Sequence, residues 1–317
     1  MDGGEAVRAL LEANADRDVI VINHRVSRDL HFKLSRTLQA NAVNESCTVF
    51  LTTRGGDPNG GYRVARCLRH YYKHVRLVVP SRCKSAGTLI AIAANEVAIG
   101  DLGELGPLDI QVKKGSELEE NSSGLDIQQA LQAVTTHAQD AFYRLMLSTR
   151  EFGLSTKLCA EFAATVTSGI VHPLMSQIDP LRVGEMQRAT RVALEYGERL
   201  NTYARNLKQN ALERLIGAYP AHGFVIDRKE AGELFTKVGH PTKEEQDLTD
   251  AFWEFISGEE FSEVIFLKIP LPADRDEHGD ANGANEGPEG QTPSEEQGAE
   301  LRAGVGELLA YSAASVG

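Results

Sequence analysis

The pattern that most constrains this chain is a series of short, continuous apolar runs, each bounded by polar residues. These runs are Asp18–Asn23, Cys47–Thr52, Val75–Val79 and Glu96–Ile99. A strand that is buried on both faces reads as a continuous apolar run, which is typical of a parallel sheet. The segments between the runs have helical character, at Ser27–Ala40, Tyr62–Tyr72 and Ser85–Ala94. This alternation predicts an α/β fold in which helices cover a parallel sheet.

The remainder of the chain differs from this pattern. Residues 125–208 carry apolar side chains mostly at helical spacing and are expected to form long helices, as a helical handle within a domain of residues 1–240. Residues 241–272 are expected to be a helical extension. Residues 273–317 are rich in Asp, Glu, Gly, Asn, Pro and Ser over most of their length, so we expect a largely disordered acidic tail.

Composition excludes several functional classes. The formal net charge of −12 disfavours nucleic acid as the principal partner, because an acidic chain repels phosphate backbones. The four cysteines form no C-x-x-C pair, so neither a metal site nor a cofactor is expected, and each is interpreted as a small buried apolar residue. The first residues lack the apolar region of a signal peptide. No uncharged apolar run reaches the roughly 20 residues that span a bilayer, which predicts a cytoplasmic protein without a membrane span.

Three glycine- or serine-containing segments follow three of the predicted strands. Gly55-Gly56 follows one strand directly, Ser85 follows the next after a short loop, and the glycine-rich segment Asp101–Asp109 follows a third. In open α/β sheets the reactive crevice lies at the carboxyl ends of the strands. The three segments are therefore expected to meet at one edge of the sheet.

Acyl transfer requires the residue types that these segments supply. A serine at a strand-to-helix junction serves as a nucleophile, and Ser85 begins a predicted helix. Backbone N–H groups without a Cβ nearby can donate to the oxyanion, which fits Gly55 or Gly56, and the small Ala86 and Gly87 leave room for a substrate backbone. Taken singly, Ser85 is more readily interpreted as a helix N-cap and Gly55-Gly56 as a plain turn, and it is their combination at adjacent strand ends that favours a site.

The sequence resembles the Clp/crotonase superfamily in the stretches TTRGGDPNGGYRVA, Lys84-Ser85-Ala86-Gly87-Thr88 and GDLGELGPLDIQ. More closely it resembles the serine dehydrogenase proteinase family, a relative of signal peptide peptidase A and of the Clp protease subunit. The stretches QIDPLRVGEMQRA and YPAHGFVIDRKEA also resemble that family, so the likeness covers roughly residues 18–240.

The resemblance implies a spiral of ββα units, serine peptidase activity, and family positions for the nucleophile at Ser85 and for the oxyanion donors at Gly56 and Ala86. It leaves the general base open, because the segment Leu108-Asp109-Ile110 has no histidine where the Clp subunit carries one. The candidates are His222, His172, Lys84, and the pair Lys113 and Lys114. Asp109 or Asp179 would orient the base, although Asp179-Pro180 also reads as a turn that begins a helix.

Three functions are consistent with these residues. The first is an ATP-independent serine endopeptidase acting on peptides or unfolded segments, since the chain carries no G-x-x-x-x-G-K-[ST] motif. The second is a crotonase-type acyl-CoA enzyme, and the third is a catalytically degenerate scaffold that binds extended peptides. Homo-oligomerisation through the helical segment 125–208 is expected in each case.

Overall fold

The computed structural model describes residues 2–108, 111–113, 121–258, 261–268 and 308. The chain divides into two compact units. The sheet unit comprises residues 1–108, 196–212 and 223–317. The helical unit comprises residues 109–195 and 213–222.

The sheet unit is built on a sheet that has six strands within the described residues, in the order β10-β1-β2-β3-β5-β9. All neighbouring pairs are parallel except β10, which runs antiparallel to β1 at one edge. The bounds of the strands are β1 Arg17–Asn23, β2 Ser46–Thr52, β3 His74–Val79, β5 Glu96–Ile99, β9 Val238–Gly239 and β10 Glu263–Leu267. The predicted α/β class with a mostly parallel sheet is confirmed, and the four expected strands match to within one residue at each end.

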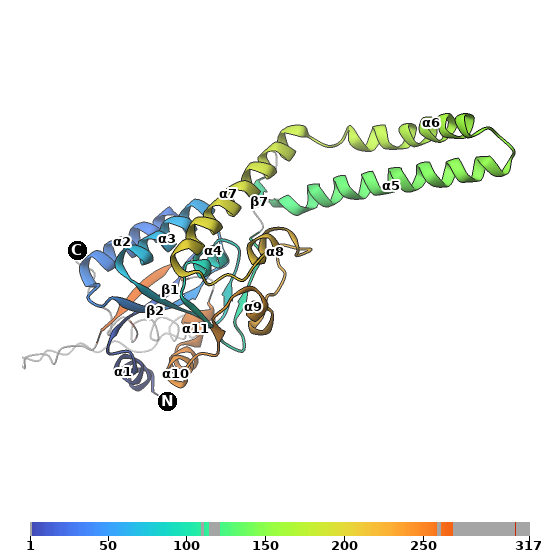
Figure 1. Ribbon diagram of the computed structural model, residues 1–317. Helices are drawn as coiled ribbons and strands as arrows, with labels where there is room; N and C mark the ends of the chain where they lie inside the picture. Colours follow the sequence, from blue (N-terminus) through green and yellow to red (C-terminus); the bar gives the residue numbers. More distant parts are fainter. Residues whose placement is uncertain (1, 109–110, 114–120, 259–260, 269–307, 309–317) are drawn as a thin grey trace, which may run out of the picture. The chain divides into compact units, whose positions relative to one another are not determined.

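Helices cover both faces of this sheet. In Figure 1, α2 (Arg28–Asn41) and α3 (Pro58–Tyr71) lie over one face, while α1 (Gly3–Ala13) and α10 (Lys243–Ala251) lie on the other. Ser27 caps α2, since its hydroxyl accepts a hydrogen bond from Leu30 N at 3.1 Å. On the second face, α11 (Trp253–Ser257) and apolar side chains of α1 and α10 pack against alternate residues of the strands, including Val19, Val21, Phe50 and Val78.

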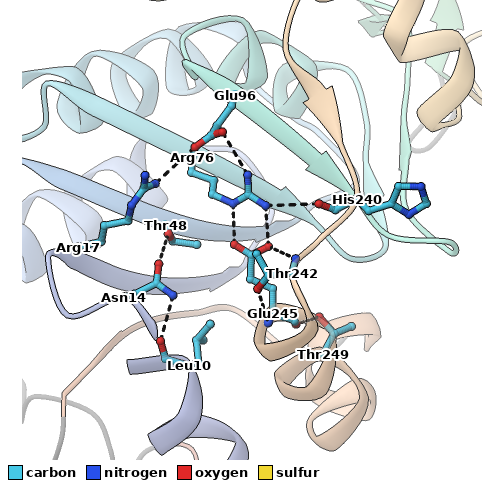
Figure 2. Close-up of polar contacts among 10 residues, drawn as sticks. All are labelled: Leu10, Asn14, Arg17, Thr48, Arg76, Glu96, His240, Thr242, Glu245 and Thr249. Carbon is cyan, nitrogen blue, oxygen red and sulfur yellow. Dashed lines mark hydrogen bonds and ion pairs between the residues drawn. The ribbon is translucent and has the colours of Figure 1, made fainter. Parts of the chain in front are cut away.

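A buried ion pair attaches α10 to the middle of the sheet (Figure 2). Arg76 on β3 donates through Nε and Nη2 to the two carboxylate oxygens of Glu245, at 2.7 and 2.8 Å. Glu245 is 1% exposed and also completes a capping box with Thr242 at the start of α10. These hydrogen bonds satisfy the carboxylate, which would otherwise be costly to bury.

Smaller elements lie at the carboxyl edge of the sheet. The short strands β4 (Arg82–Cys83) and β6 (Glu104–Leu105) pair in parallel, and the helix α4 (Ala86–Ile92) follows β4. Ile226 forms an isolated antiparallel bridge with Leu105, and α9 spans Arg228–Leu234. All four cysteines are buried, as expected from the sequence.

The helical unit, taken by itself, contains α5 (Gly124–Glu151) and α6 (Thr156–Met175), with the strands β7 (Gln111–Lys113) and β8 (Asn121–Ser123). Two further helices, α7 (Pro180–Ala204) and α8 (Ala211–Gly217), have residues in both units. Among the described residues α6 is the helix that, by length and composition, could cross a bilayer, and 11% of its apolar window is buried. Length and composition alone are weak evidence for a membrane span.

One expectation from the sequence requires correction. Residues 241–272 are not only a helical extension, because β10 joins the central sheet beside β1. Within the expected helical segment 125–208, the helix α6 continues through Pro173 to Met175. The expected disorder of residues 273–317 falls outside the described residues, except for Leu308, which is buried in the core beneath α1.

Candidate active site

Ser85 joins β4 to α4 in a conformation that serine rarely adopts. Its φ is 50° and its ψ is −111°, outside the regions that non-glycine residues ordinarily populate. The side chain is half-buried and makes no capping hydrogen bond to α4. The interpretation of Ser85 as an ordinary N-cap is therefore wrong. A strained serine on a sharp strand-to-helix turn is the arrangement by which α/β hydrolases present a nucleophile.

The Gly55-Gly56 turn lies directly against Ser85. Both glycines have positive φ, 89° at Gly55 and 147° at Gly56, which favours glycine strongly. A Cβ on Gly55 would stand 2.9 Å from the Cβ of Ser85, and one on Gly56 would stand 2.1 Å from Val26 O. The close approach to Ser85 and to the Val26 backbone thus depends on two residues without side chains.

The backbone hydrogen bonds around this turn determine which amides are used. Gly55 N donates to Thr53 Oγ1 at 3.1 Å. Gly56 bridges Val26 in parallel, through bonds from Val26 N to Gly55 O and from Asp57 N to Val26 O, which leave the amide of Gly56 outside the bridge. Within the described part of the chain, neither Gly56 N nor Ala86 N donates a hydrogen bond. Of the two glycines, Gly56 is consequently the one whose amide remains for an oxyanion.

The small residues at the start of α4 serve packing. Ala86 and Gly87 are both buried. A Cβ on Gly87 would stand 2.5 Å from Thr53 Cγ2 and 2.8 Å from Cys83 Sγ. Gly87 therefore lets α4 approach the chain that carries the glycine turn, rather than making room for a substrate as the sequence had indicated.

Lys84, the residue before Ser85, is held by three acceptors. Its ammonium contacts Glu104 Oε1 at 2.8 Å, Phe224 O at 3.2 Å and Leu105 O at 3.3 Å, and the side chain is 14% exposed. Three acceptors match the three N–H donors of an ammonium group, so all of its donors are used in these contacts. Lys84 thus connects the start of α4 to β6 and to the backbone at Phe224, and Glu104 is its ion-pair partner.

Thr88 provides a second link that sequence reasoning did not find. Its hydroxyl, buried on α4, lies 2.6 Å from Gly106 O and 3.3 Å from Gly106 N. A Cβ on Gly106 would stand 2.6 Å from Lys84 Cδ. The Leu105-Gly106 segment is thereby fixed to both ends of the Lys84–Thr88 stretch. The sequence signal for this link was the repeated glycine in the segment that follows β5, at Gly100, Gly103 and Gly106.

The other predicted catalytic residues that the structure describes, apart from Lys84, belong to the helical unit. His222 is half-buried and His172 is exposed on α6, and both belong to the helical unit. Asp179 accepts a hydrogen bond from Leu181 N at 2.8 Å, which confirms that it begins a helix. Lys113 lies in β7. Asp109 and Lys114 fall outside the described residues.

A histidine–carboxylate pair that the sequence did not indicate lies at the same edge of the sheet. His24 directly follows β1, is 5% exposed, and places Nε2 3.2 Å from Asp29 Oδ2 and Nδ1 2.6 Å from Arg25 O. Both ring nitrogens face oxygen acceptors. His24 thus fastens the loop before α2 and has no ring nitrogen directed at a serine. Its place directly after a buried strand was the signal for it.

Comparisons with known proteins add little to these observations. No protein-family model matches the sequence. A stretch of 80 residues is 29% identical to part of an uncharacterized protein of Methanocaldococcus jannaschii, and it covers 25% of this chain and 28% of that protein. The matched stretch is therefore well under two thirds of that relative.

Solved structures with local similarity include mutants of a stomatin-specific protease and of ClpP1. A serine-to-alanine mutant of a membrane-bound stomatin-specific protease is 16% identical, with 45% of this chain and 67% of that chain covered, at a TM-score of 0.29. A second mutant of that protease, in complex with a substrate peptide, is 18% identical, with 47% of this chain and 66% of that chain covered, at a TM-score of 0.28. A ClpP1 mutant from Listeria monocytogenes is 17% identical, with 48% of this chain and 82% of that chain covered, at a TM-score of 0.24. Scores this low carry no argument about fold or activity, so the resemblance to the Clp/crotonase superfamily stays a prediction.

Proposed function

We propose that this chain is a serine endopeptidase that needs no ATP and cleaves peptides or unfolded protein segments. Ser85 attacks the scissile carbonyl and forms an acyl-enzyme, and water then releases the acyl group. The observation that carries the proposal is the strained backbone of Ser85 against the Gly55-Gly56 turn. A cost of roughly 1–3 kcal/mol for such a conformation persists only where the surroundings impose it, and such residues cluster at active sites.

The amides of Gly56 and Ala86 are the proposed oxyanion donors. Both are left over from the backbone hydrogen bonds of the described residues, and Ala86 is the first residue of a helix, where N–H groups lack intrahelical partners. Each such donor lowers the barrier by about 2.7–4 kcal/mol in serine peptidases. The short, buried links through Lys84 and Thr88 keep the Ser85 turn rigid, which pre-organises the donors before substrate arrives.

The general base remains a choice among His222, His172 and the pair Lys113 and Lys114. His222 comes first because the family resemblance puts a triad residue near it, and Lys84 is disfavoured by its three acceptors. Replacing the base should abolish one limb of the pH–rate profile, whereas replacing a bystander leaves the profile unchanged. His222→Ala and His172→Ala, measured side by side over the same pH range, assign the role, and two unchanged profiles would reject both histidines.

Hydrolysis of a fluorescein-labelled, chemically unfolded protein in nucleotide-free buffer tests the proposal. The wild type should release labelled peptides, and Ser85→Ala should lower the rate at least about 10³-fold, as loss of a nucleophile does. Ser81→Ala is the matched control, since its described contact is the backbone bond from Glu104 N to Ser81 O. Equal rates for wild type and Ser85→Ala would refute the assignment.

Two outcomes would favour the other functions. Peptide binding that survives Ser85→Ala, without turnover by the wild type, would favour a peptide-binding scaffold. Activity on an acyl-CoA that persists in Ser85→Ala would favour a crotonase-type enzyme, which uses the same kind of oxyanion donors without a serine nucleophile.

The helical unit is proposed to mediate homo-oligomerisation. Large apolar side chains are exposed on its helices, among them Tyr143, Leu147, Leu158, Phe162, Ile170 and Leu174. Exposed apolar surface of this kind marks protein–protein contacts in soluble proteins. Cytoplasmic localisation also stays a proposal.

A further inference from the structure

A groove of about 670 Å³ lies on the outer surface of the sheet unit, away from the strands. It is bounded by α2, by α3 and by the end of α7 that belongs to this unit. Its lining includes Arg28 and His31 from α2, Arg63, Arg66 and His70 from α3, and Tyr196 from α7. The volume is in the range of small-molecule sites, about 300–1,000 Å³.

Aromatic rings form a fixed wall of this groove. Tyr62 and Tyr196 stack with their ring centroids 4.2 Å apart and their planes 12° apart. The hydroxyl of Tyr196 donates to Asn59 Oδ1 at 2.9 Å, and Arg66 Nη1 donates to the hydroxyl of Tyr62 at 3.2 Å. The guanidinium of Arg66 also lies over the Tyr203 ring, 5.4 Å from its centroid. Arg66 is therefore positioned by its neighbours before any ligand arrives.

The groove concentrates positive charge on a chain whose formal net charge is −12. Among the described residues that line it there are three arginines and two histidines, and no Asp or Glu. Arg28 and Arg63 are exposed and, within the described residues, pair with no carboxylate. The pKa of His31 is lowered, first by burial and then by the charge of Arg63, so the positive potential reaches the wall formed by α2.

We propose that this groove binds the phosphate groups of a small oligophosphate, either inorganic or the phosphate chain of a nucleotide. Guanidinium groups match phosphate oxygens with two parallel N–H donors each, and an anion relieves the repulsion among the converging arginines. A compact, multiply charged group uses several of these cations at once inside a concave site of limited volume. The proposal is independent of catalysis, because none of these residues contacts Ser85.

Isothermal titration of the full chain with tripolyphosphate, with adenosine triphosphate and with a hexaglutamate peptide tests the site. Both phosphate compounds should bind, with affinity falling as salt rises, and hexaglutamate should bind at least tenfold more weakly. Equal affinities for the two phosphate compounds would identify the phosphates alone as the ligand, and tighter nucleotide binding would add stacking on the tyrosines. Arg63→Gln should weaken both by at least tenfold, while Ser85→Ala should leave both unchanged.

Arg36→Gln is the matched control. Arg36 is exposed on α2, lies over the Phe32 ring at 5.1 Å and does not line the groove, and its replacement removes the same charge. Its affinities should equal those of the wild type. Absence of phosphate binding, tighter binding of hexaglutamate, or equal losses in Arg63→Gln and Arg36→Gln would overturn the proposal. Thermal unfolding of both variants excludes misfolding as the cause, since both side chains are exposed.

Discussion

The sheet unit and the helical unit differ in how far their large apolar side chains are buried. In the sheet unit many large apolar side chains, such as Leu34 and Leu77, are fully buried between strands and helices. In the helical unit Leu147 is 62% exposed and Phe152 is 82% exposed. The sheet unit thus buries a core of its own, while the helical unit retains apolar surface of the kind that partners cover.

The largest difference should come from ion pairs. Arg76→Ala leaves the buried carboxylate of Glu245 without its partner, and we expect a loss of about 3–5 kcal/mol in the free energy of unfolding. Lys157→Ala removes an exposed pair with Glu161 within α6 and should cost less than about 0.5 kcal/mol. Urea unfolding followed by circular dichroism measures both. Equal losses in the free energy of unfolding would mean that the buried ion pair of the sheet unit is no stronger than the exposed one of the helical unit.

Truncation of leucine should give the next largest difference. Leu77→Ala in β3 opens a cavity in a closely packed core and should cost about 2–5 kcal/mol. Leu147→Ala on α5 should change the unfolding free energy by less than about 0.5 kcal/mol in the monomer. Thermal unfolding at low protein concentration measures both, and a large cost for Leu147→Ala would show that its surface is covered within one chain.

Association should depend on the helical unit alone. Phe162→Ser on α6 should weaken self-association at least tenfold, about 1.4 kcal/mol, because it removes exposed apolar surface from the proposed contact. Phe32→Ser, an exposed phenylalanine on α2, is the control and should leave association unchanged. Sedimentation velocity over a concentration series reports the result. A monomeric wild type, or equal losses in both variants, would reject the helical unit as the interface.

Helix caps should give the smallest difference. Ser27 caps α2 in the sheet unit and Ser155 caps α6 in the helical unit, at 3.1 and 3.3 Å from their donors. Each serine-to-alanine change should cost about 1 kcal/mol locally. In Ser27→Ala the loss should appear in global unfolding, and in Ser155→Ala mainly as faster amide hydrogen exchange in the first turn of α6. Slowed exchange in α6 would contradict this.

The same contrast explains what the sequence could predict. The strands β1, β2, β3 and β5 were predictable because both of their faces are buried, which forces continuous apolar runs. The strand β10 carries the same signal, the apolar run Val264–Leu267, but this run was interpreted as part of a helical extension. The two-residue strands β4 and β6 depend on contacts between distant segments, which local pattern does not encode.

At the candidate site, residue types were predictable and their contacts were not. Glycine at positions 55 and 56 and serine at a helix start are visible in the sequence, but the strain at Ser85 and the acceptors around Lys84 arise from tertiary packing. The basic groove had a signal that was overlooked. Tyr62, Arg66 and His70 recur at four-residue spacing, as do Arg63, Cys67 and Tyr71, which places both sets along one side of α3.

The central claim is that the hydroxyl of Ser85 is the nucleophile, and covalent labelling measures it most directly. Wild type and Ser85→Ala are treated with a fluorophosphonate, and intact mass and peptide mapping locate the adduct. The account predicts one adduct per chain, on Ser85, and none in the alanine variant, with folding of the variant checked by circular dichroism. An unlabelled wild type, or an adduct that persists in Ser85→Ala, would contradict it.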